Sequence, residues 1–164
     1  MKESKGFSLI ELIVVIAIMA VLTGVITISV STIGGYYARE CAENIVSKLN
    51  STKTSTMGKN SVELEIYRDT DEVYYARIIE NGDVSNARTE RIGKKSVSVQ
   101  YSMEEDYTNV QSLGSTPVSI SFDRCSGEVK LDSNDKCLRK IWVSQGKFTR
   151  EITIYQLTGK VELK

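Results

Sequence analysis

The feature that most constrains this chain is a run of twenty residues without a charge, from Leu12 to Ser31. A helix of about 20 apolar residues can cross the hydrocarbon core of a bilayer. One acid, Glu11, stands immediately before the run, and Lys2 and Lys5 precede it. Basic residues on that side favour a cytoplasmic N-terminus. The sequence therefore predicts one membrane segment near the start of the chain, with a carboxylate at its beginning.

Three interpretations of this segment compete. A secretory signal peptide has a shorter apolar core, of about 7–15 residues, and ends in a small-x-small cleavage site. The run here is longer, and no clear Ala-x-Ala site ends it. A plain membrane anchor accounts for the run and the lysines but leaves Glu11 unexplained. Because a carboxylate in lipid is costly, Glu11 is a functional candidate by default.

The third interpretation rests on the residues Lys5-Gly6-Phe7-Ser8-Leu9-Ile10-Glu11-Leu12. This stretch resembles the N-terminal signature of type IV prepilins and pseudopilins. The resemblance implies that a prepilin peptidase cleaves after Gly6 and methylates the new amine of Phe7. It also implies that Glu11 pairs with the terminal amine of a neighbouring subunit, so that two buried charges offset each other. The chain lacks proline before Pro117, so the kinked helix of many major pilins is not carried over.

The same resemblance implies a set of partners and a location. The partners are other pilin or pseudopilin subunits, met through the N-terminal helix, the prepilin peptidase and an inner-membrane assembly platform. Before assembly the chain would lie in the cell membrane with its globular domain outside. After assembly it would form part of an extracellular or periplasmic filament.

Apolar and small residues recur at helical spacing after Gly34-Gly35. They fall at i, i+3, i+4, i+7, i+8 and i+11, which is one face of an amphipathic helix: Ala38, Cys41, Ala42, Ile45, Val46 and Leu49. The resemblance to prepilins implies a leader peptide at residues 1–6, and the helical spacing extends the apolar segment, so we expect one long helix over 7–57. Residues 9–31 of this helix would form the transmembrane segment and filament core.

Beyond the helix, residues 58–164 are typical of a β-rich domain. Short runs of alternating apolar and polar residues, separated by glycine-containing turns, predict about eight antiparallel strands. The expected fold class is α+β: a long N-terminal helix packed on an antiparallel β-sheet domain, as in pilins. Residues 86–95 and 104–116 are expected to be loops, and the expected strands are 62–66, 73–79, 96–101, 118–122, 128–131, 138–143, 152–157 and 161–163.

The second half carries a further resemblance. The helix end at 49–53, the strand at 62–66 and the segment Ile152 to Tyr155 followed by Thr158-Gly159-Lys160-Val161 are similar to minor pseudopilins of the GspH and FimT kind.

Composition argues against an enzyme. The chain has no histidine, which removes the usual general base, the His-assisted nucleophiles and histidine zinc sites. Its three cysteines form no Cys-x-x-Cys motif, so we expect no metal site and no cofactor.

Cys125 and Cys137 flank a turn-rich segment in the part expected outside the membrane. A disulfide between them would close a short loop and contribute about 3 kcal/mol in the chain-entropy model. Two reduced thiols are the alternative.

The balanced total charge hides a basic C-terminal end. Seven bases and two acids lie between Lys136 and Lys164, whereas eleven acids and six bases lie between Ser61 and Asp106. The basic residues either lie on a solvated face of the sheet or contact an acidic partner. The candidate nucleic-acid contacts are Arg139, Lys140, Lys147 and Arg150.

The predicted function is a minor pilin or pseudopilin of a type IV pilus or type II secretion-like filament. The alternative is a DNA-binding minor pilin of a DNA-uptake pilus.

Overall fold

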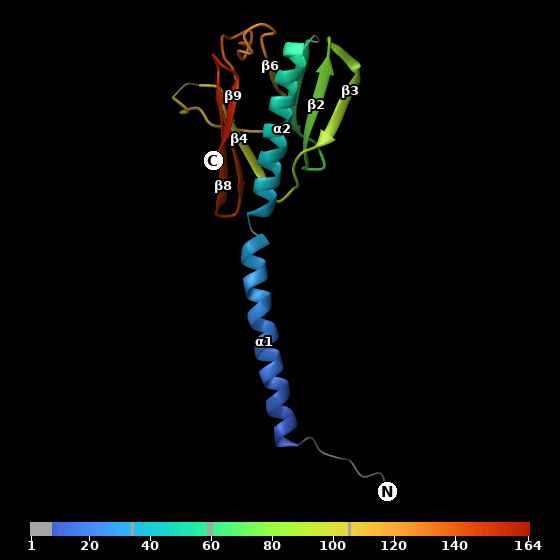
Figure 1. The fold of residues 1–164 in the computed structure, drawn as a ribbon, viewed down its shortest axis with the longest axis vertical. Helices are drawn as coiled ribbons and strands as arrows, with labels where there is room; N and C mark the ends of the chain where they lie inside the picture. Colours follow the sequence, from blue (N-terminus) through green and yellow to red (C-terminus); the bar gives the residue numbers. More distant parts are fainter. Residues whose placement is uncertain (1–7, 34, 59–60, 105) are drawn as a thin grey trace. The chain divides into compact units, whose positions relative to one another are not determined.

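The computed structural model describes residues 8–33, 35–58, 61–104 and 106–164. The chain divides into two compact units, the second of which runs from Gly35 to Lys164. The first unit holds helix α1 (Leu9–Ile33), whose side chains are described as far as Leu22. The second unit begins with helix α2 (Tyr36–Gly58) and contains all the strands of the described residues (Figure 1).

Helix α2 covers the residues of the periodic pattern and ends at Gly58, one residue beyond the expected boundary at residue 57. Its buried face follows the predicted spacing and continues with two threonines near the C-terminal end. Small side chains near the start of the helix allow the backbone to approach its neighbours closely. The buried residues of α2 are Ala38, Cys41, Ala42, Ile45, Leu49, Thr52 and Thr56.

The strands form two antiparallel sheets. The first has the order β3-β2-β1-β6 and the second the order β5-β4-β7-β8-β9. The first sheet comprises β1 (Val62–Arg68), β2 (Tyr74–Glu80), β3 (Asp83–Arg91) and β6 (Val118–Ser121). The second comprises β4 (Ser98–Ser102), β5 (Gln111–Ser112), β7 (Lys140–Gln145), β8 (Phe148–Tyr155) and β9 (Lys160–Leu163).

Helix α2 contacts both sheets. It touches β1 and β2 of the first sheet and β7, β8 and β9 of the second. Figure 1 shows strands of the two sheets on opposite sides of α2. One hydrophobic core joins Ile45 and Leu49 of the helix to Leu64 of the first sheet and to Val143 and Ile152 of the second. The structure thus confirms the expected fold class, a helix packed on an antiparallel β-domain.

Three of the expected turns are confirmed. Asn81 and Gly82, both at positive φ, connect β2 to β3, as the Asn-Gly signal predicts. Gly146 lies in the tight turn between β7 and β8, where Gln145 pairs with Phe148. Gly159 lies in the turn between β8 and β9.

Two expected loops contain strands. The sequence predicts a loop over residues 86–95, but β3 occupies Asp83–Arg91. Nearly every side chain of β3 is exposed, so the strand shows no alternation between apolar and polar residues. Residues 104–116 contain the short strand β5, which pairs with β4 at the edge of the second sheet. Edge strands without a buried face lack the periodic signal on which the prediction depends.

The expected strand at 128–131 is wrong. Only an isolated bridge joins Phe122 to Val129. The backbone N–H of Val129 donates to Gln156 and that of Lys130 donates to Ser121, so successive residues bond to different segments. A regular ladder cannot form where the hydrogen-bond partners diverge in this way.

Gly159 lies at a close approach between the β8–β9 turn and the loop after β6. Its φ is +56°, and an added Cβ would lie 2.1 Å from the carbonyl oxygen of Gly127 and 3.1 Å from the ring of Phe122. The end of α2 joins the same junction, because Lys53 Nζ donates to the carbonyl oxygen of Thr158 at 2.6 Å. A side chain at this position would therefore force three segments apart.

We expect Gly159→Ala to cost on the order of 3 kcal/mol of unfolding free energy or more, since it combines a left-handed backbone with a backbone clash. Gly146→Ala is the matched control: its φ is +59°, but its added methyl group meets nothing within 4 Å. The control should lose only the cost of the left-handed backbone, about 1–2 kcal/mol. Denaturant unfolding of the full chain in mild detergent, followed by the fluorescence of the single tryptophan, Trp142, measures both. Equal losses would contradict the proposed clash.

Candidate functional site

The first candidate site is the beginning of α1. Ser8 caps the helix: the backbone N–H of Glu11 lies 3.3 Å from Ser8 Oγ and 3.1 Å from the Ser8 carbonyl oxygen. A serine followed three residues later by glutamate, ahead of an apolar run, is the capping-box pattern. The residues Ser8-Leu9-Ile10-Glu11 have this pattern, which is a signal for the start of a helix that the sequence analysis missed. The cap defines where α1 begins and places Glu11 in its first turn.

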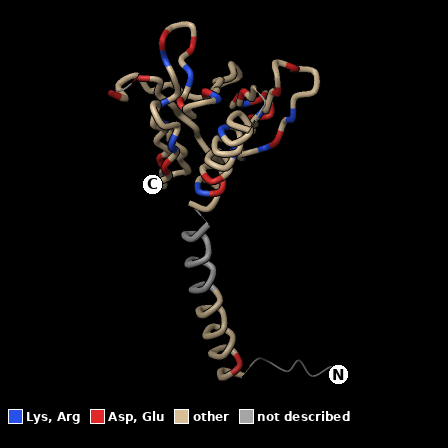
Figure 2. The backbone as a smooth tube through the Cα atoms, turned by 45° about the horizontal axis from the view of Figure 1, so that its top comes forward, with Lys and Arg blue, Asp and Glu red and all other residues tan. Residues whose placement is uncertain are grey.

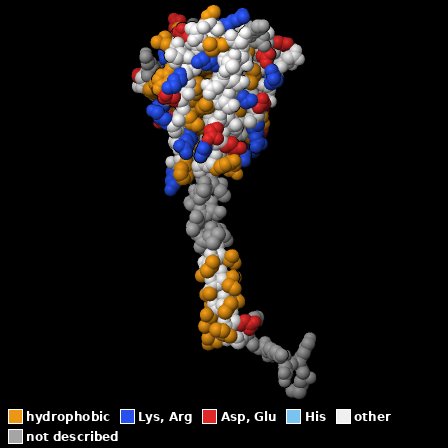
Figure 3. All heavy atoms as spheres, in the orientation of Figure 1, with side chains coloured by type: hydrophobic (Ala, Val, Ile, Leu, Met, Phe, Trp, Pro, Cys, Tyr) orange, Lys and Arg blue, Asp and Glu red, His pale blue; other side chains and the backbone are white. Residues whose placement is uncertain are grey.

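Glu11 stands among exposed apolar side chains. Those of Leu9, Ile10 and Leu12 are more than half exposed, and the apolar character continues along the described part of α1. Figure 2 shows an acidic residue at the start of this helix, and Figure 3 shows that the surface next to it is otherwise hydrophobic. An acid in the first turn also suits the positive end of the helix dipole. The described part of the first unit therefore presents one carboxylate at the end of an apolar surface.

The predicted processing residues, Gly6 and Phe7, lie outside the described residues. Among the helices of the described part, none combines the length and the apolar character that crossing a membrane requires.

The second candidate set, the basic residues of the C-terminal end, does not converge on one free surface. Lys140 Nζ pairs with Glu151 Oε2 at 2.8 Å and lies 5.3 Å from the ring centroid of Trp142. Arg139 is half-buried and donates to the side-chain oxygen of Gln156. Two of the four candidate cations are thus engaged inside the domain.

The other two are exposed but lie apart from that pair. Lys147 is in the turn between β7 and β8, next to the ring of Phe148. Arg150 is on β8 at a position that shares a face with the buried Ile152, whereas the neighbouring Glu151 faces the opposite side, towards Lys140. Figure 3 shows charges of both signs interspersed over the visible face of the domain.

The three cysteines are free thiols in the structure. Cys41 and Cys137 are buried, and Cys125 is exposed. The disulfide between Cys125 and Cys137 therefore stays a prediction, without support from the observed arrangement. Burial raises the pKa of Cys41 to about 12 and also raises that of Cys137. Both buried thiols are accordingly poor nucleophiles at neutral pH.

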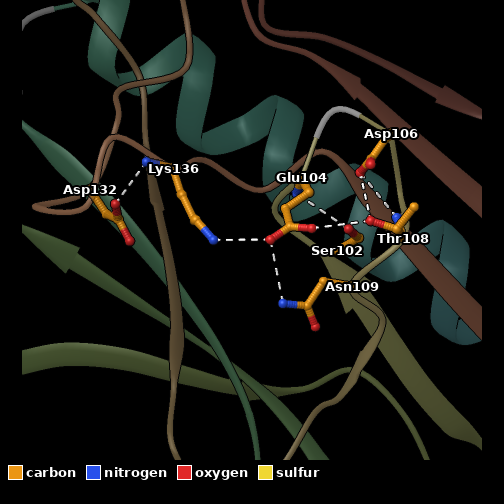
Figure 4. Close-up of polar contacts among 7 residues, drawn as sticks. All are labelled: Ser102, Glu104, Asp106, Thr108, Asn109, Asp132 and Lys136. Atoms are coloured by element: carbon orange, nitrogen blue, oxygen red, sulfur yellow. Dashed lines mark hydrogen bonds and ion pairs between the residues drawn. The ribbon is translucent and has the colours of Figure 1, made fainter.

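A polar network that the sequence did not predict holds the loop between β4 and β5. Glu104 is its centre: it pairs with Lys136 Nζ at 3.0 Å and accepts bonds from Thr108 and Asn109 (Figure 4). These bonds hold the pKa of Glu104 below its usual value, with the Lys136 bond as the largest cause. Lys136 lies 32 residues further along the chain, so no local pattern predicts the contact.

One comparison with known proteins bears on these sites. The family model described as the prokaryotic N-terminal methylation motif matches residues 1–27. The N-terminal segment is type IV prepilin-like. The match includes Glu11 and its cap and ends before the β-domain begins, so it does not reach the region of the GspH and FimT resemblance. The searches of curated proteins and of solved structures found no match to this chain.

We expect the cysteines to differ sharply in alkylation rate. With a pKa of about 12, Cys41 is about one part in ten thousand thiolate at pH 8, and it is fully buried. Cys125 should react with iodoacetamide first, whereas Cys41 and Cys137 should react only after denaturation. Peptide mass spectrometry after timed quenching measures this. Rapid labelling of Cys41 in the native chain would contradict the packing of α2, and a mass two hydrogens lower for a joined 125–137 peptide pair would establish the disulfide.

Proposed function

We propose that this chain is a minor pilin or pseudopilin, a structural subunit that assembles into, initiates or caps a type IV pilus or a type II secretion-like filament. The observation that carries the proposal is the methylation-motif match over residues 1–27. Two structural features support it: the capped helix α1, with Glu11 in its first turn, and the β-domain packed on α2.

In this proposal residues 1–6 are a leader that prepilin peptidase removes, and Phe7 becomes the methylated N-terminus. Residues 9–31 serve first as the membrane segment and later as the filament core, although no helix of the described residues by itself has the length and apolar character of a membrane span. The support is the charge-free run from Leu12 to Ser31. The β-domain lies outside the membrane, and an inner-membrane assembly platform moves the subunit into the filament.

Glu11 has the chemistry that such an assembly step needs. Bundled apolar helices exclude water, and an unpaired carboxylate buried among them is strongly destabilising. The methylated amine of Phe7 on a neighbouring subunit would supply the opposite charge. Docking of a new subunit then satisfies both groups at once, which favours one axial register over others.

No specific observation supports the DNA-uptake alternative. Of its four candidate contacts, Lys140 is paired with Glu151 and Arg139 is half-buried, which leaves Lys147 and Arg150 as the exposed cations. Non-specific DNA binding needs several cations free to neutralise phosphates. We therefore keep the proposal to a structural subunit.

We expect processing at Gly6 in a cell with an active prepilin peptidase. Mass spectrometry of the chain from such a cell should give an N-terminal peptide that starts at methylated Phe7. Gly6→Ala is not expected to alter α1, since Gly6 precedes the capping residue Ser8, but it should abolish or slow cleavage. Recovery of the chain with its leader intact beside active peptidase would contradict the proposal.

We expect Glu11→Gln to reduce incorporation into filaments by at least about tenfold, because an amine buried without its partner costs about 3–5 kcal/mol. Glutamine preserves the capping-box position, so the start of α1 should be unchanged. Glu43→Gln is the matched control, since it makes the same charge change in an exposed pair with Arg39 that contributes little. Quantitative blotting of sheared filaments against membrane-retained protein measures the effect. Assembly of Glu11→Gln at the level of the control would rule out the pairing.

A further inference from the structure

A groove opens in the β-domain beside the turn between β8 and β9. Its volume is about 450 Å³, which lies within the range of small-molecule sites, about 300–1,000 Å³. Polar and apolar groups both line it. The lining residues with side chains suited to holding a ligand are Tyr107, Arg139, Thr153, Tyr155, Gln156 and Leu157.

Arg139 is the charged group of this groove. Its backbone is held on both sides, because its N–H donates to Ser102 and its carbonyl oxygen accepts from Ile154. Its guanidinium donates to the neutral side-chain oxygen of Gln156. Among the residues that the structure describes, no carboxylate lies within ion-pair distance of Arg139. A half-buried guanidinium with an uncharged partner retains donors for a planar anion.

Tyr107 forms one aromatic wall and is held firmly. Its φ is +58°, a left-handed conformation that non-glycine residues rarely adopt. Such backbone persists where its surroundings enforce it, and it is concentrated at functional sites. The network around Glu104 fixes the same loop through Thr108 (Figure 4). The Tyr107 ring packs edge-to-face on Trp142, with centroids 6.5 Å apart.

Tyr155 and Leu157 provide a second aromatic wall and an apolar rim. Tyr155 is 44% exposed and Leu157 is 76% exposed. The Tyr155 hydroxyl donates to Glu162 Oε2 at 2.9 Å, which orients the ring. Glu162 itself pairs with Lys160 at 2.5 Å, so its charge is compensated. Thr153 and Gln156 add a hydroxyl and an amide to the lining of the groove.

We propose that this groove binds an acidic sugar unit, a uronate within a polysaccharide, with its carboxylate on Arg139. A pyranose ring presents C–H groups on its faces and hydroxyls around its edge. Two tyrosine rings and a leucine suit the faces, while the threonine hydroxyl and the glutamine amide suit the edge. A guanidinium can bind the planar carboxylate through two parallel hydrogen bonds. This role goes beyond that of a filament subunit and does not depend on it.

An acidic peptide is the main competing ligand, because Arg139 would also bind its carboxylates. The paired aromatic walls favour a sugar, since a flexible acidic side chain gains little from two exposed rings. Nucleic acid would need further free cations, and Lys140 and Lys160 are both ion-paired.

The test is calorimetric titration of the full chain in mild detergent. The probes are galacturonic acid oligomers, neutral galactose oligomers of the same length and a glutamate-rich peptide. We expect the uronate oligomers to bind at least roughly tenfold more tightly than the neutral oligomers, as one charge-assisted contact predicts. They should also bind more tightly than the peptide, because only the sugar packs on the two aromatic walls. Arg139→Gln and Tyr107→Ala should each weaken uronate binding by roughly tenfold or more. Arg88→Gln makes the same charge change on β3 of the other sheet and should leave binding unchanged.

Trp142 fluorescence and circular dichroism establish that each variant is folded. Tyr107→Ala keeps the guanidinium in place, so it tests the aromatic wall even where Arg139→Gln fails to fold. Equal binding of the acidic and neutral oligomers would overturn the assignment of Arg139 as the residue that binds the uronate carboxylate. Preference for the peptide, or undiminished uronate binding by both groove variants, would overturn the proposal as a whole. None of these outcomes depends on filament assembly.

Discussion

Burial of one face of α2 against two sheets is the interaction on which the β-domain depends. The sheets share no strand, yet the core residues of both meet the same helix. Ile45 and Leu49 are fully buried there, and each large apolar side chain contributes about 1.5–3 kcal/mol by leaving water. Without that helix, each sheet would expose an apolar face. The packing of both sheets in the second unit therefore depends on a stripe of seven buried residues on α2.

The same stripe shows what the sequence could predict about the fold. Its apolar members recur at helical spacing, so the helix and its buried face can be located from the sequence alone. Thr52 and Thr56 continue the face, but the pattern does not reveal them because polar residues carry no hydrophobic signal. Strand β3 escapes prediction for a related reason: it lies at an edge with both faces solvated, so its sequence does not alternate. Strand order depends on contacts between distant residues, which local patterns do not encode.

Whether a candidate site can be predicted from the sequence depends on how far apart its residues lie along the chain. The N-terminal motif is contiguous, so residues 5–12 alone are enough to recognise it. Its helix cap also lies within four consecutive residues. The groove around Arg139 draws on a loop before β5, the start of β7 and the turn after β8. Sequence reasoning selected Arg139 only for its charge and grouped it with Lys147 and Arg150. The fold instead places it in a groove that two tyrosines also line.

The direct passage from α1 into α2 has a mechanical consequence. Only two residues separate Ile33, the last residue of α1, from Tyr36, the first of α2. A tensile load carried by α1 therefore enters the β-domain through the helix at its centre. Buried side chains from Ala38 to Thr56 would all have to slide along both sheets together before α2 could leave. Where the load acts along α2, these contacts are sheared together, and they resist force better than contacts that are peeled one at a time.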